Sequence, residues 1–351
     1  MDLSKIQREI MRILLQAVEA FPYMFPQLCR SWVMINWNRL QFEEGKKMHI
    51  KPGATPYQHK RSSLDLSCTS GFGESVHPDV ICIDEGFTKM GWKYLMTVTP
   101  FPKGIVYFEN PEFLVSHDGI EWSIPAGGKS PVVPPPYDWI GYNSDPALLR
   151  DGNFVHLIFR EVRNERPSVV MTVYSISTSD GVAWSAPKII YQIIRPQNEG
   201  ALLMSPALLK IGTKYVIWYV DLEEGGFVIR RSEGDDLFSL SLGNRCEIYG
   251  MPDDLEVWHI DIVDDGDRLI MAICAGNRES RGRRSVIFAE SFDWGKSWRC
   301  FGERLDPDSN MGENSLYKAA LAPKANGTWL LYYSYQDMER HWFTVVKDIV
   351  L

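Results

Sequence analysis

One structural unit repeats five times in this chain of 351 residues, and the repeat limits the fold more than any other feature. Each unit begins with a polar or aromatic residue, continues as a short apolar strand, turns at Gly or Asp, and returns as an alternating, aromatic-rich strand. Such a hairpin cannot bury both of its faces alone, so neighbouring units are expected to stack around one axis. The equivalent first residues are separated by 68, 60, 54 and 58 positions and are His77, Asp145, Ser205, His259 and Tyr317.

A spacing of about 60 residues suits a four-stranded propeller blade. The sequence therefore predicts an all-β fold, a five-bladed β-propeller over residues 46–351, with a short N-terminal α-helical extension over residues 1–45. Apolar residues at helical spacing predict that extension, and they are Ile6, Ile10, Ile13, Leu14 and Val18. The fifth unit contains three strands, so a strand from residues 48–60 is expected to complete its sheet. The blades are predicted to start near residues 77, 144, 205, 259 and 317.

A second repeat lies in the outer half of three units and reads FLVSHDGIEWSIP (113–125), YSISTSDGVAWSAP (174–187) and IFAESFDWGKSWRCF (287–301). In a turn of this kind the Asp side chain caps the backbone, Gly takes a positive φ, and Trp packs beneath. Asp118, Asp180 and Asp293 are therefore predicted to form turns rather than to act in catalysis. The segments resemble the Asp-box, or BNR repeat, of propeller sialidases and other glycan-active propellers. That resemblance implies a place on the outer part of the blade, away from an active site.

Charge and composition exclude several classes of function. The net charge of −8 argues against a nucleic-acid groove, which needs a basic patch. The one dense basic cluster, RESRGRR at 278–284, is short and typical of a solvated loop. No stretch is apolar enough to span a bilayer, and the N-terminus lacks the features of a signal peptide. The six cysteines show no CxxC pairing, which favours a cytoplasmic protein, although a non-classically exported protein has the same features.

The innermost strands of a propeller converge on the axis, and their first residues line one mouth of the channel. Here those positions are polar, and an H-x-D pattern occurs twice, at His77 with Asp79 and at His259 with Asp261. Alternate strand residues point the same way, so each His and its Asp are expected to project to one side. No cofactor is expected, but two such pairs could also hold a divalent cation such as calcium at the axis. The simpler alternative is that the histidines satisfy backbone groups.

Five blades with a carboxylate at an inner-strand start, in HPDV (77–80) and SDPALL (144–149), resemble the glycoside hydrolase clan of arabinanases, β-xylosidases and levan- or sucrose-cleaving enzymes. The resemblance implies a glycosidase that cleaves a poly- or oligosaccharide in the central funnel by carboxylate acid/base chemistry. Asp79 would match the clan's base or nucleophile, and Asp145 its second, orienting Asp. The clan's general acid is a Glu shortly before a Pro, but the corresponding segment here reads Met204-Ser205-Pro206.

The general acid must then come from a preceding loop. Glu256 is favoured, because Trp258 and His259 would form a partly apolar wall that raises its pKa; Glu199 and Glu109 are the alternatives. The residues predicted to bind substrate lie at inner-strand starts or on the segments that approach them, and they are His77, Tyr142, Asn143, Arg160, Glu199, Ser205, Trp258, His259, Asp261, Tyr317 and Lys318.

Two alternatives stay open beside a glycosidase. The first is a propeller that binds a glycan or a protein without turnover, which the missing general acid supports, with Asp79 and Asp145 merely capping strand ends. The second is a sialidase-like enzyme, which needs three arginines around a carboxylate. Arg160 and either Arg230 or Arg231 lie near strand ends, but the sequence offers no convincing third. The expected partner is a carbohydrate, with no nucleic acid and no membrane span, and the sequence predicts no oligomeric state.

Overall fold

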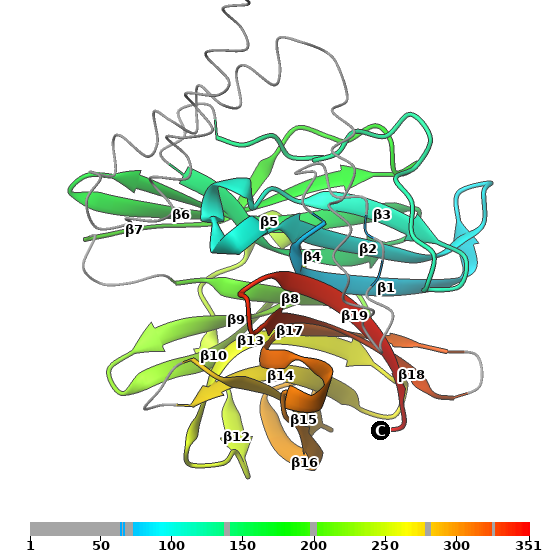
Figure 1. Ribbon diagram of the computed structural model, residues 1–351. Helices are drawn as coiled ribbons and strands as arrows, with labels where there is room; N and C mark the ends of the chain where they lie inside the picture. Colours follow the sequence, from blue (N-terminus) through cyan, green and yellow to red (C-terminus); the bar gives the residue numbers. More distant parts are fainter. Residues whose placement is uncertain are drawn as a thin grey trace, which may run out of the picture. The chain divides into compact units, whose positions relative to one another are not determined.

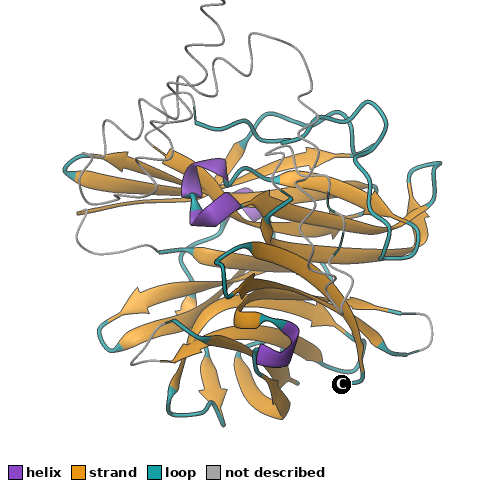
Figure 2. Cartoon of the chain, in the orientation of Figure 1, coloured by secondary structure: helices purple, strands orange, loops and turns teal. Residues whose placement is uncertain are grey.

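The computed structural model describes residues 64, 66, 73–136, 141–196, 202–277, 282–324 and 327–351. These residues fold almost wholly as β-strands (Figure 2). The chain divides into two compact units, Met1–Pro56 and Tyr57–Leu351, and the first of these lies outside the described residues. The helical extension predicted for residues 1–45 lies outside them too. Within the described residues no helix is long and apolar enough to cross a membrane. The described helices are short 3-10 turns: η1 (Pro102–Gly104), η2 (Val106–Phe108), η4 (Leu237–Ser239) and η5 (Ser309–Met311).

The strands form five sheets (Figure 1). The first sheet contains β1 (Ser75–Phe87), β2 (Trp92–Pro100) and β3 (Glu112–Ser116). The second contains β4 (Gly141–Asp151), β5 (Phe154–Glu165), β6 (Ser168–Thr178) and β7 (Lys188–Pro196). The third contains β8 (Met204–Ile211), β9 (Lys214–Glu223), β10 (Gly226–Gly234) and β11 (Asn244–Arg245). The fourth contains β13 (Leu255–Asp264), β14 (Leu269–Asn277), β15 (Arg284–Ser291), β16 (Ser297–Leu305) and, parallel to β16, β12 (Glu247–Tyr249); the fifth contains β17 (Glu313–Pro323), β18 (Trp329–Asp337) and β19 (Trp342–Ile349).

The first strands of the five sheets form a closed ring. Strand β1 lies against β4, β4 against β8, β8 against β13, β13 against β17, and β17 returns to β1. Within each sheet the following strands pair outward from this inner strand. The described residues therefore form a five-bladed β-propeller, and the fold predicted from the repeat is confirmed.

Each blade buries its faces against its two neighbours, so the propeller has five separate hydrophobic cores. The core between the first and second blades contains Leu95 and Leu157, and the core between the third and fourth contains Trp218 and Trp298. The other three lie between the second and third, the fourth and fifth, and the fifth and first blades. The stacking that the repeat predicted thus supplies the hydrophobic burial that a single sheet cannot.

Every inner strand is irregular at the position that the repeat aligned. The pairing with the second strand of each blade shifts at a bulge, between Val76 and Asp79, Ser144 and Ala147, Met204 and Ala207, Val257 and His259, and Leu316 and Ala319. In three of these bulges a non-glycine residue has a positive φ and precedes a proline: His77 (57°), Asp145 (49°) and Ser205 (49°). Proline lacks the N–H that a regular ladder needs, so it suits such a break. Bulges commonly re-aim a side chain beside an active site.

The ring is closed by contacts between the start of the first blade and the last strand, β19. Leu64 N donates a hydrogen bond to Thr344 O at 3.0 Å, and the Ser75 and Thr344 hydroxyls lie 2.9 Å apart. Glu74 Oε2 accepts a hydrogen bond from Trp342 N at 3.0 Å. Residues that precede the first blade therefore bind the three-stranded fifth blade. The segment predicted for this role, residues 48–60, lies outside the described residues.

The outer hairpin turns are built as their sequence pattern predicted. Asp118 Oδ1 accepts hydrogen bonds from Ile120 N and Glu121 N, and Asp180 and Asp293 cap their turns in the same way. Gly295 has φ +74°, and a Cβ there would lie 2.4 Å from the Trp218 ring. Trp298 packs edge-on against Trp218 and donates its indole N–H to Gly295 O. These aspartates act in turn formation.

Replacing Trp298 by Ala should destabilise the propeller, because this side chain is 1% exposed and fills the core between two blades. The expected loss is about 3–5 kcal/mol of the free energy of unfolding, measured by urea denaturation. Trp294→Ala is the matched control, since that residue belongs to the same turn but is 54% exposed; its effect should stay within about 0.5 kcal/mol. Equal losses in both variants would contradict the role assigned to Trp298.

Candidate functional site

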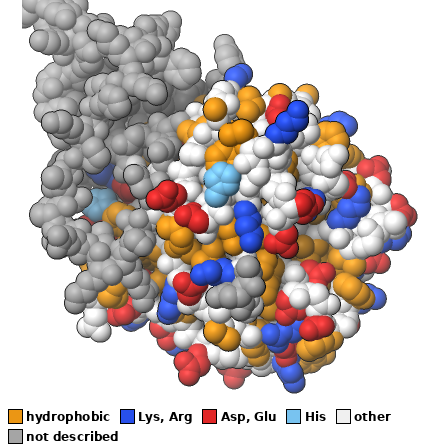
Figure 3. Space-filling model, turned by 90° about the vertical axis from the view of Figure 1, so that its right-hand side faces the viewer, with side chains coloured by type: hydrophobic (Ala, Val, Ile, Leu, Met, Phe, Trp, Pro, Cys, Tyr) orange, Lys and Arg blue, Asp and Glu red, His pale blue; other side chains and the backbone are white. Residues whose placement is uncertain are grey.

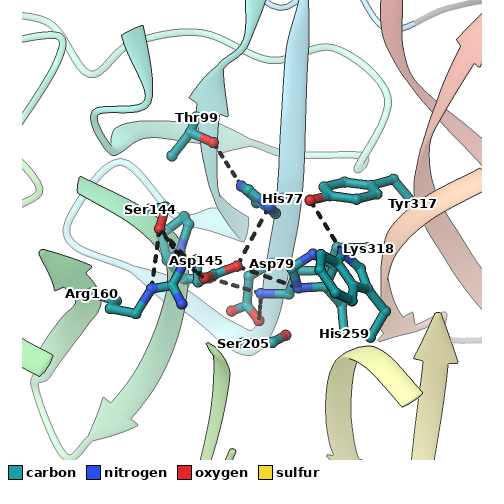
Figure 4. Close-up of polar contacts among 12 residues, drawn as sticks. His77, Asp79, Thr99, Ser144, Asp145, Arg160, Ser205, His259, Tyr317 and Lys318 are labelled. Carbon is teal, nitrogen blue, oxygen red and sulfur yellow. Dashed lines mark hydrogen bonds and ion pairs between the residues drawn. The ribbon is translucent and has the colours of Figure 1, made fainter. Parts of the chain in front are cut away.

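Two histidines and an aspartate from three different blades converge at the propeller axis (Figure 4). His77 comes from β1, Asp145 from β4 and His259 from β13, each at most 3% exposed. Asp145 Oδ1 lies 3.4 Å from His77 Nε2 and 3.3 Å from His259 Nδ1. One ligand-type atom from each residue lies within 4.8 Å of the other two. The bulges at the inner-strand starts bring these side chains together.

The converging atoms have no hydrogen-bond partner among the described residues. This holds for His77 Nε2, Asp145 Oδ1 and both ring nitrogens of His259. A buried polar atom without a partner costs about 1–3 kcal/mol, so such a cluster calls for an explanation. The other nitrogen of His77, Nδ1, lies 2.9 Å from Thr99 Oγ1, and this contact fixes the ring orientation. A hydrogen bond of this kind on the far nitrogen is the usual support of a metal-binding histidine.

Burial keeps both imidazoles neutral and the neighbouring cations keep the carboxylate charged. Burial lowers the pKa of His77 to about 4, against a weaker opposing effect of Asp145, and it lowers the pKa of His259 well below its usual value. Burial alone would raise the pKa of Asp145, but Arg160 above all holds it below its ordinary range. Arg160 Nη2 lies 2.8 Å from Asp145 Oδ2. Neutral imidazoles and an ionised carboxylate are the protonation states that bind a metal ion.

These donor types fit a first-row divalent metal ion. Two imidazole nitrogens and one carboxylate oxygen form a common three-ligand set for zinc or iron in which positions stay open for water and substrate. Calcium prefers six to eight oxygen ligands, so the calcium considered from the sequence fits this set less well. The H-x-D pattern pointed to this place, although the sequence assigned no ligand set.

The aspartates of the two H-x-D triplets have a different task. Asp79 Oδ2 accepts a hydrogen bond from Leu148 N of β4 at 2.7 Å, and Asp261 Oδ2 accepts one from Leu321 N of β17 at 3.0 Å. Each aspartate therefore ties its inner strand to that of the next blade. Burial and the nearby Asp79 carboxyl raise the pKa of Asp261 well above its usual value. The role of Asp79 as a base or nucleophile stays a prediction.

Lys318 completes this inter-blade network. Its side chain is fully buried, and Nζ donates to Pro146 O at 2.8 Å and lies 3.6 Å from Asp79 Oδ1 (Figure 4). It thereby fixes the peptide that follows Asp145. Ser205 is also a tie between blades, because its hydroxyl donates to Ile260 O and accepts from Ile260 N. Lys318 and Ser205, both predicted from the sequence as site residues, thus each link two blades at the axis.

Glu109 is the alternative to Glu256 that the sequence offered as the general acid. The charge of Asp145 contributes to the pKa of this residue. Glu109 lies in the loop between η2 and β3 and is 4% exposed. Burial, with a further contribution from Asp145 and against the effect of Arg160, raises the pKa of Glu109 well above its usual value. Glu256 stands at the start of β13, and its Oε2 lies 3.4 Å from where a Cβ on Gly226 would be. Glu199 lies outside the described residues.

The other predicted site residues support loops or pair with one another. Asn143 Nδ2 donates to Asn110 Oδ1 and to Pro134 O, which ties the loop at Pro134 to β4. Arg160 donates to Ser144 Oγ and Leu202 O as well as binding Asp145. Burial raises the pKa of Tyr142 to about 12. The arginines considered for a sialidase are engaged with acidic side chains: Arg160 with Asp145, Arg230 with Asp221 and Glu223, and Arg231 with Glu233.

An aromatic wall stands beside the histidines. The Tyr317 ring lies 4.6 Å from the His259 ring and 5.1 Å from that of His77, measured between ring centres. Trp258 donates its indole N–H to the Tyr317 hydroxyl at 3.3 Å, and the Trp342 ring centre lies 5.1 Å from that of Tyr317. The sequence predicted Trp258 and Tyr317 here but missed Trp342 and Arg284. Trp342 follows the last hairpin turn, where the repeat carries no signal for the axis.

Comparisons with known proteins agree with this fold. No protein-family model matches the chain. Among curated proteins, the A type blood N-acetyl-α-D-galactosamine deacetylase of Flavonifractor plautii is 27% identical over 113 residues, which is 32% of this chain and 14% of that protein. The match therefore spans a small part of the relative's length.

Solved structures share the five-bladed architecture over most of the described chain. An N-acetylgalactosamine deacetylase from F. plautii, in complex with blood group B trisaccharide, gives a TM-score of 0.71 at 17% identity and covers 82% of this chain and 93% of that one. Sucrose-6-phosphate hydrolase from Lactobacillus gasseri gives 0.60 at 14% identity, over 86% and 62%. Xylan β-1,4-xylosidase from Bacillus halodurans gives 0.56 at 14%, over 78% and 52%. The chain has the propeller fold found in these glycan-acting enzymes.

Stability should fall in acid because the two axial histidines are buried in their neutral form. The pKa of His77 is about 4 in the folded protein and near 6.5 when it is unfolded, so its contribution is complete above about pH 6.5 and is lost as the pH falls towards 4. Each such histidine adds at most about 1.4 kcal/mol per pH unit to the slope of the free energy of unfolding against pH. Urea unfolding across this range, with a chelator present, measures the slope.

His77→Gln should flatten this pH dependence. His117→Gln is the control, because His117 is exposed on the outer part of the first blade and stacks on Trp92. It should leave the slope of the wild-type protein unchanged. A His77→Gln protein that keeps the full slope would show that other groups cause the acid sensitivity.

Proposed function

We propose that this protein is a metal-dependent hydrolase that removes the acetyl group from an acetamido sugar of a glycan at the propeller axis. The observation that carries the proposal is the convergence of His77 Nε2, His259 Nδ1 and Asp145 Oδ1, which are buried and without hydrogen-bond partners among the described residues. The partial sequence similarity to a GalNAc deacetylase and the likeness in fold to a deacetylase structure support the choice of reaction.

Amide hydrolysis suits the charges of this site better than cleavage of a glycosidic bond. A glycosidase needs two carboxyl groups that flank the scissile bond. Here Asp145 is neutralised by Arg160 and faces two imidazoles, while Asp79 is held by Leu148 N and lies close to Lys318. An amide hydrolase needs one metal site and one proton-transferring group, and the described residues supply candidates for both.

Each residue then has a defined task. His77, His259 and Asp145 would hold the metal ion, which when bound lowers the pKa of water and polarises a carbonyl group. Arg160 keeps Asp145 ionised through the 2.8 Å ion pair. Glu109 takes the proton of the attacking water and passes it to the amine nitrogen as the C–N bond breaks, which yields acetate and a free amino sugar. Burial raises the pKa of Glu109, which is the direction expected of a carboxyl group that returns a proton to a leaving amine.

The aromatic wall gives a sugar ring a place to bind. Trp258 and Tyr317 are partly buried and adjoin His259, so their rings would contact a pyranose beside the metal ligands. Tyr317 also carries a hydroxyl that accepts the Trp258 indole N–H, which fixes the geometry of the wall.

A second candidate function is glycoside hydrolysis through Asp79 and Asp145 with a separate general acid. Its support is the likeness in fold to a xylosidase and to sucrose-6-phosphate hydrolase. This reaction releases a reducing sugar instead of acetate, and it requires Asp79 to leave its contact with Leu148 N. The two functions therefore differ in product.

The 351-residue chain should bind about one equivalent of zinc or iron(II), measured by equilibrium dialysis and metal analysis, and should release acetate from oligosaccharides that contain N-acetylhexosamine. His259→Ala should lose both properties, whereas His117→Gln should keep them. Circular dichroism and thermal unfolding establish that each variant is folded. Release of reducing sugar without acetate, unaffected by chelator, would replace deacetylation by the glycosidase function.

Glu109→Gln should lower the rate of acetate release by about 10²- to 10⁴-fold, because the proton-transferring group is removed. Metal binding should persist, since Glu109 is not one of the three ligands. Glu256→Gln is the matched comparison, as it removes the acid that the sequence favoured. A large loss with Glu256→Gln and little change with Glu109→Gln would reverse the assignment.

A further inference from the structure

Arg284 presents a cationic group beside the candidate site. It is the first residue of β15, its backbone N donates to Ser315 Oγ at 3.1 Å, and its side chain is partly buried. Its guanidinium carbon lies 4.9 Å from the centre of the Trp258 ring and 5.2 Å from that of Tyr317. Contacts of this kind hold a guanidinium over aromatic faces and restrict its motion.

Arg284 has no acidic partner among the described residues, whereas three other buried or partly buried arginines are each paired with a carboxylate. Arg160 pairs with Asp145, Arg230 with Asp221, and Arg268 with Glu290. On the face in Figure 3, the basic side chains of the described residues are likewise interspersed with acidic ones. The Arg284 guanidinium makes no hydrogen bond or ion pair with a described residue, so none of these residues uses its planar set of N–H donors.

A guanidinium that is held against two rings and has no partner in the described part of the chain is prepared for an anion. Burying a charge is costly unless it is paired, and the planar N–H groups of Arg match carboxylate, sulfate and phosphate oxygens in pairs. The cation–π contacts orient the guanidinium without using these donors. An oxyanion can thus bind it without first breaking an ion pair in the protein.

The position of Arg284 relates such an anion to the reaction. Tyr317 is a neighbour of both groups: its ring centre lies 5.2 Å from the guanidinium carbon and 4.6 Å from the centre of the His259 ring. Burial is the main cause of the low pKa of His259, and the charge of Arg284 adds to it. The guanidinium and a candidate metal ligand therefore share Tyr317 as a neighbour, so an anion bound to Arg284 would belong to a group close to the reacting sugar.

We propose that Arg284, with Trp258 and Tyr317, forms a subsite for an anionic substituent of the glycan, so that the substrate carries a carboxylate or a sulfate ester on the sugar next to the acetamido sugar. The proposal rests on the proposed function, because it names the substrate class of the same site. Arg284 is the last residue of the basic cluster at 278–284, whose sequence is typical of a solvated loop.

The test is equilibrium binding to the full-length, metal-loaded protein by isothermal titration calorimetry. Three probes are compared: an N-acetylglucosamine–glucuronic acid disaccharide, the same disaccharide with its carboxyl group reduced to an alcohol, and this reduced disaccharide carrying one sulfate ester. We expect an anionic probe to bind about tenfold or more tightly than the reduced one, as a charge-assisted hydrogen-bonded pair would provide. The tighter of the carboxylate and sulfate probes identifies the source of the charge.

Arg284→Gln should remove this preference, so that the ratio of dissociation constants falls to about one. Arg284→Lys should recover part of it, because Lys keeps the charge but lacks the planar pair of donors. Arg283→Gln is the matched control: it makes the same change of charge one residue earlier, where the side chain is exposed and donates to Pro307 O, and it should keep the full ratio. Raising the salt concentration should shrink the preference in the wild-type protein.

The proposal is overturned if the wild-type protein binds the three probes equally or binds none, or if Arg284→Gln keeps the preference. Acetate release and metal binding are measured separately, so the two proposals can fail independently. An anion preference that depends on Arg284, without acetate release from any N-acetylated probe, would leave the subsite and refute deacetylation. Acetate release without an anion preference would support deacetylation and refute the subsite.

Discussion

Closure of the ring is the constraint on which the rest of this structure depends. No blade has a core of its own, because each sheet buries its faces only against its two neighbours. The first and fifth blades are joined through β1 and β17 and through the bonds from Leu64 and Glu74 to β19. Without these contacts two sheet faces would be exposed and the inner strands would have no common axis. The candidate site would then be lost, since its ligand-type atoms come from three different strands.

The two H-x-D triplets show how the fold and the site use the same few residues. In each triplet the His projects to the cluster around Asp145, while the Asp accepts a backbone N–H of the neighbouring inner strand. Lys318 contacts both the network between the blades and the candidate site, because it lies near Asp79 and donates to Pro146 O, directly after Asp145. A change in these straps would therefore disturb the geometry of the site as well as the stability of the ring.

The sequence predicted the fold correctly, because the fold depends on the repeat. Aligning the units identified His77, Asp145 and His259 as equivalent inner-strand residues, and the structure brings them together. The different roles of the His and the Asp in each H-x-D triplet could not be predicted from this alignment. In a regular strand the side chains of His77 and Asp79 would point to the same side. The bulge between Val76 and Asp79 changes the register locally, so the two side chains make different contacts.

Residues outside the repeat were harder to place. Glu256 was favoured because it is close in sequence to Trp258 and His259, whereas Glu109 reaches the surroundings of Asp145 from a loop whose path no periodicity describes. The same holds for Arg284. Its place over Trp258 and Tyr317 depends on the stacking of three strands from two blades, which a one-dimensional pattern does not contain.

The division of the interior into five separate cores also has a consequence for sequence divergence. A substitution at one interface can be compensated by repacking within the two blades that meet there, and the other interfaces are unaffected. Each pair of blades can thus drift independently, provided that the inner-strand bulges and the axial polar residues remain. This gives a physical reason why a chain can keep a TM-score of 0.71 to a known propeller while sharing 17% of its residues. It also explains how one ring can contain units as unequal as those of this protein.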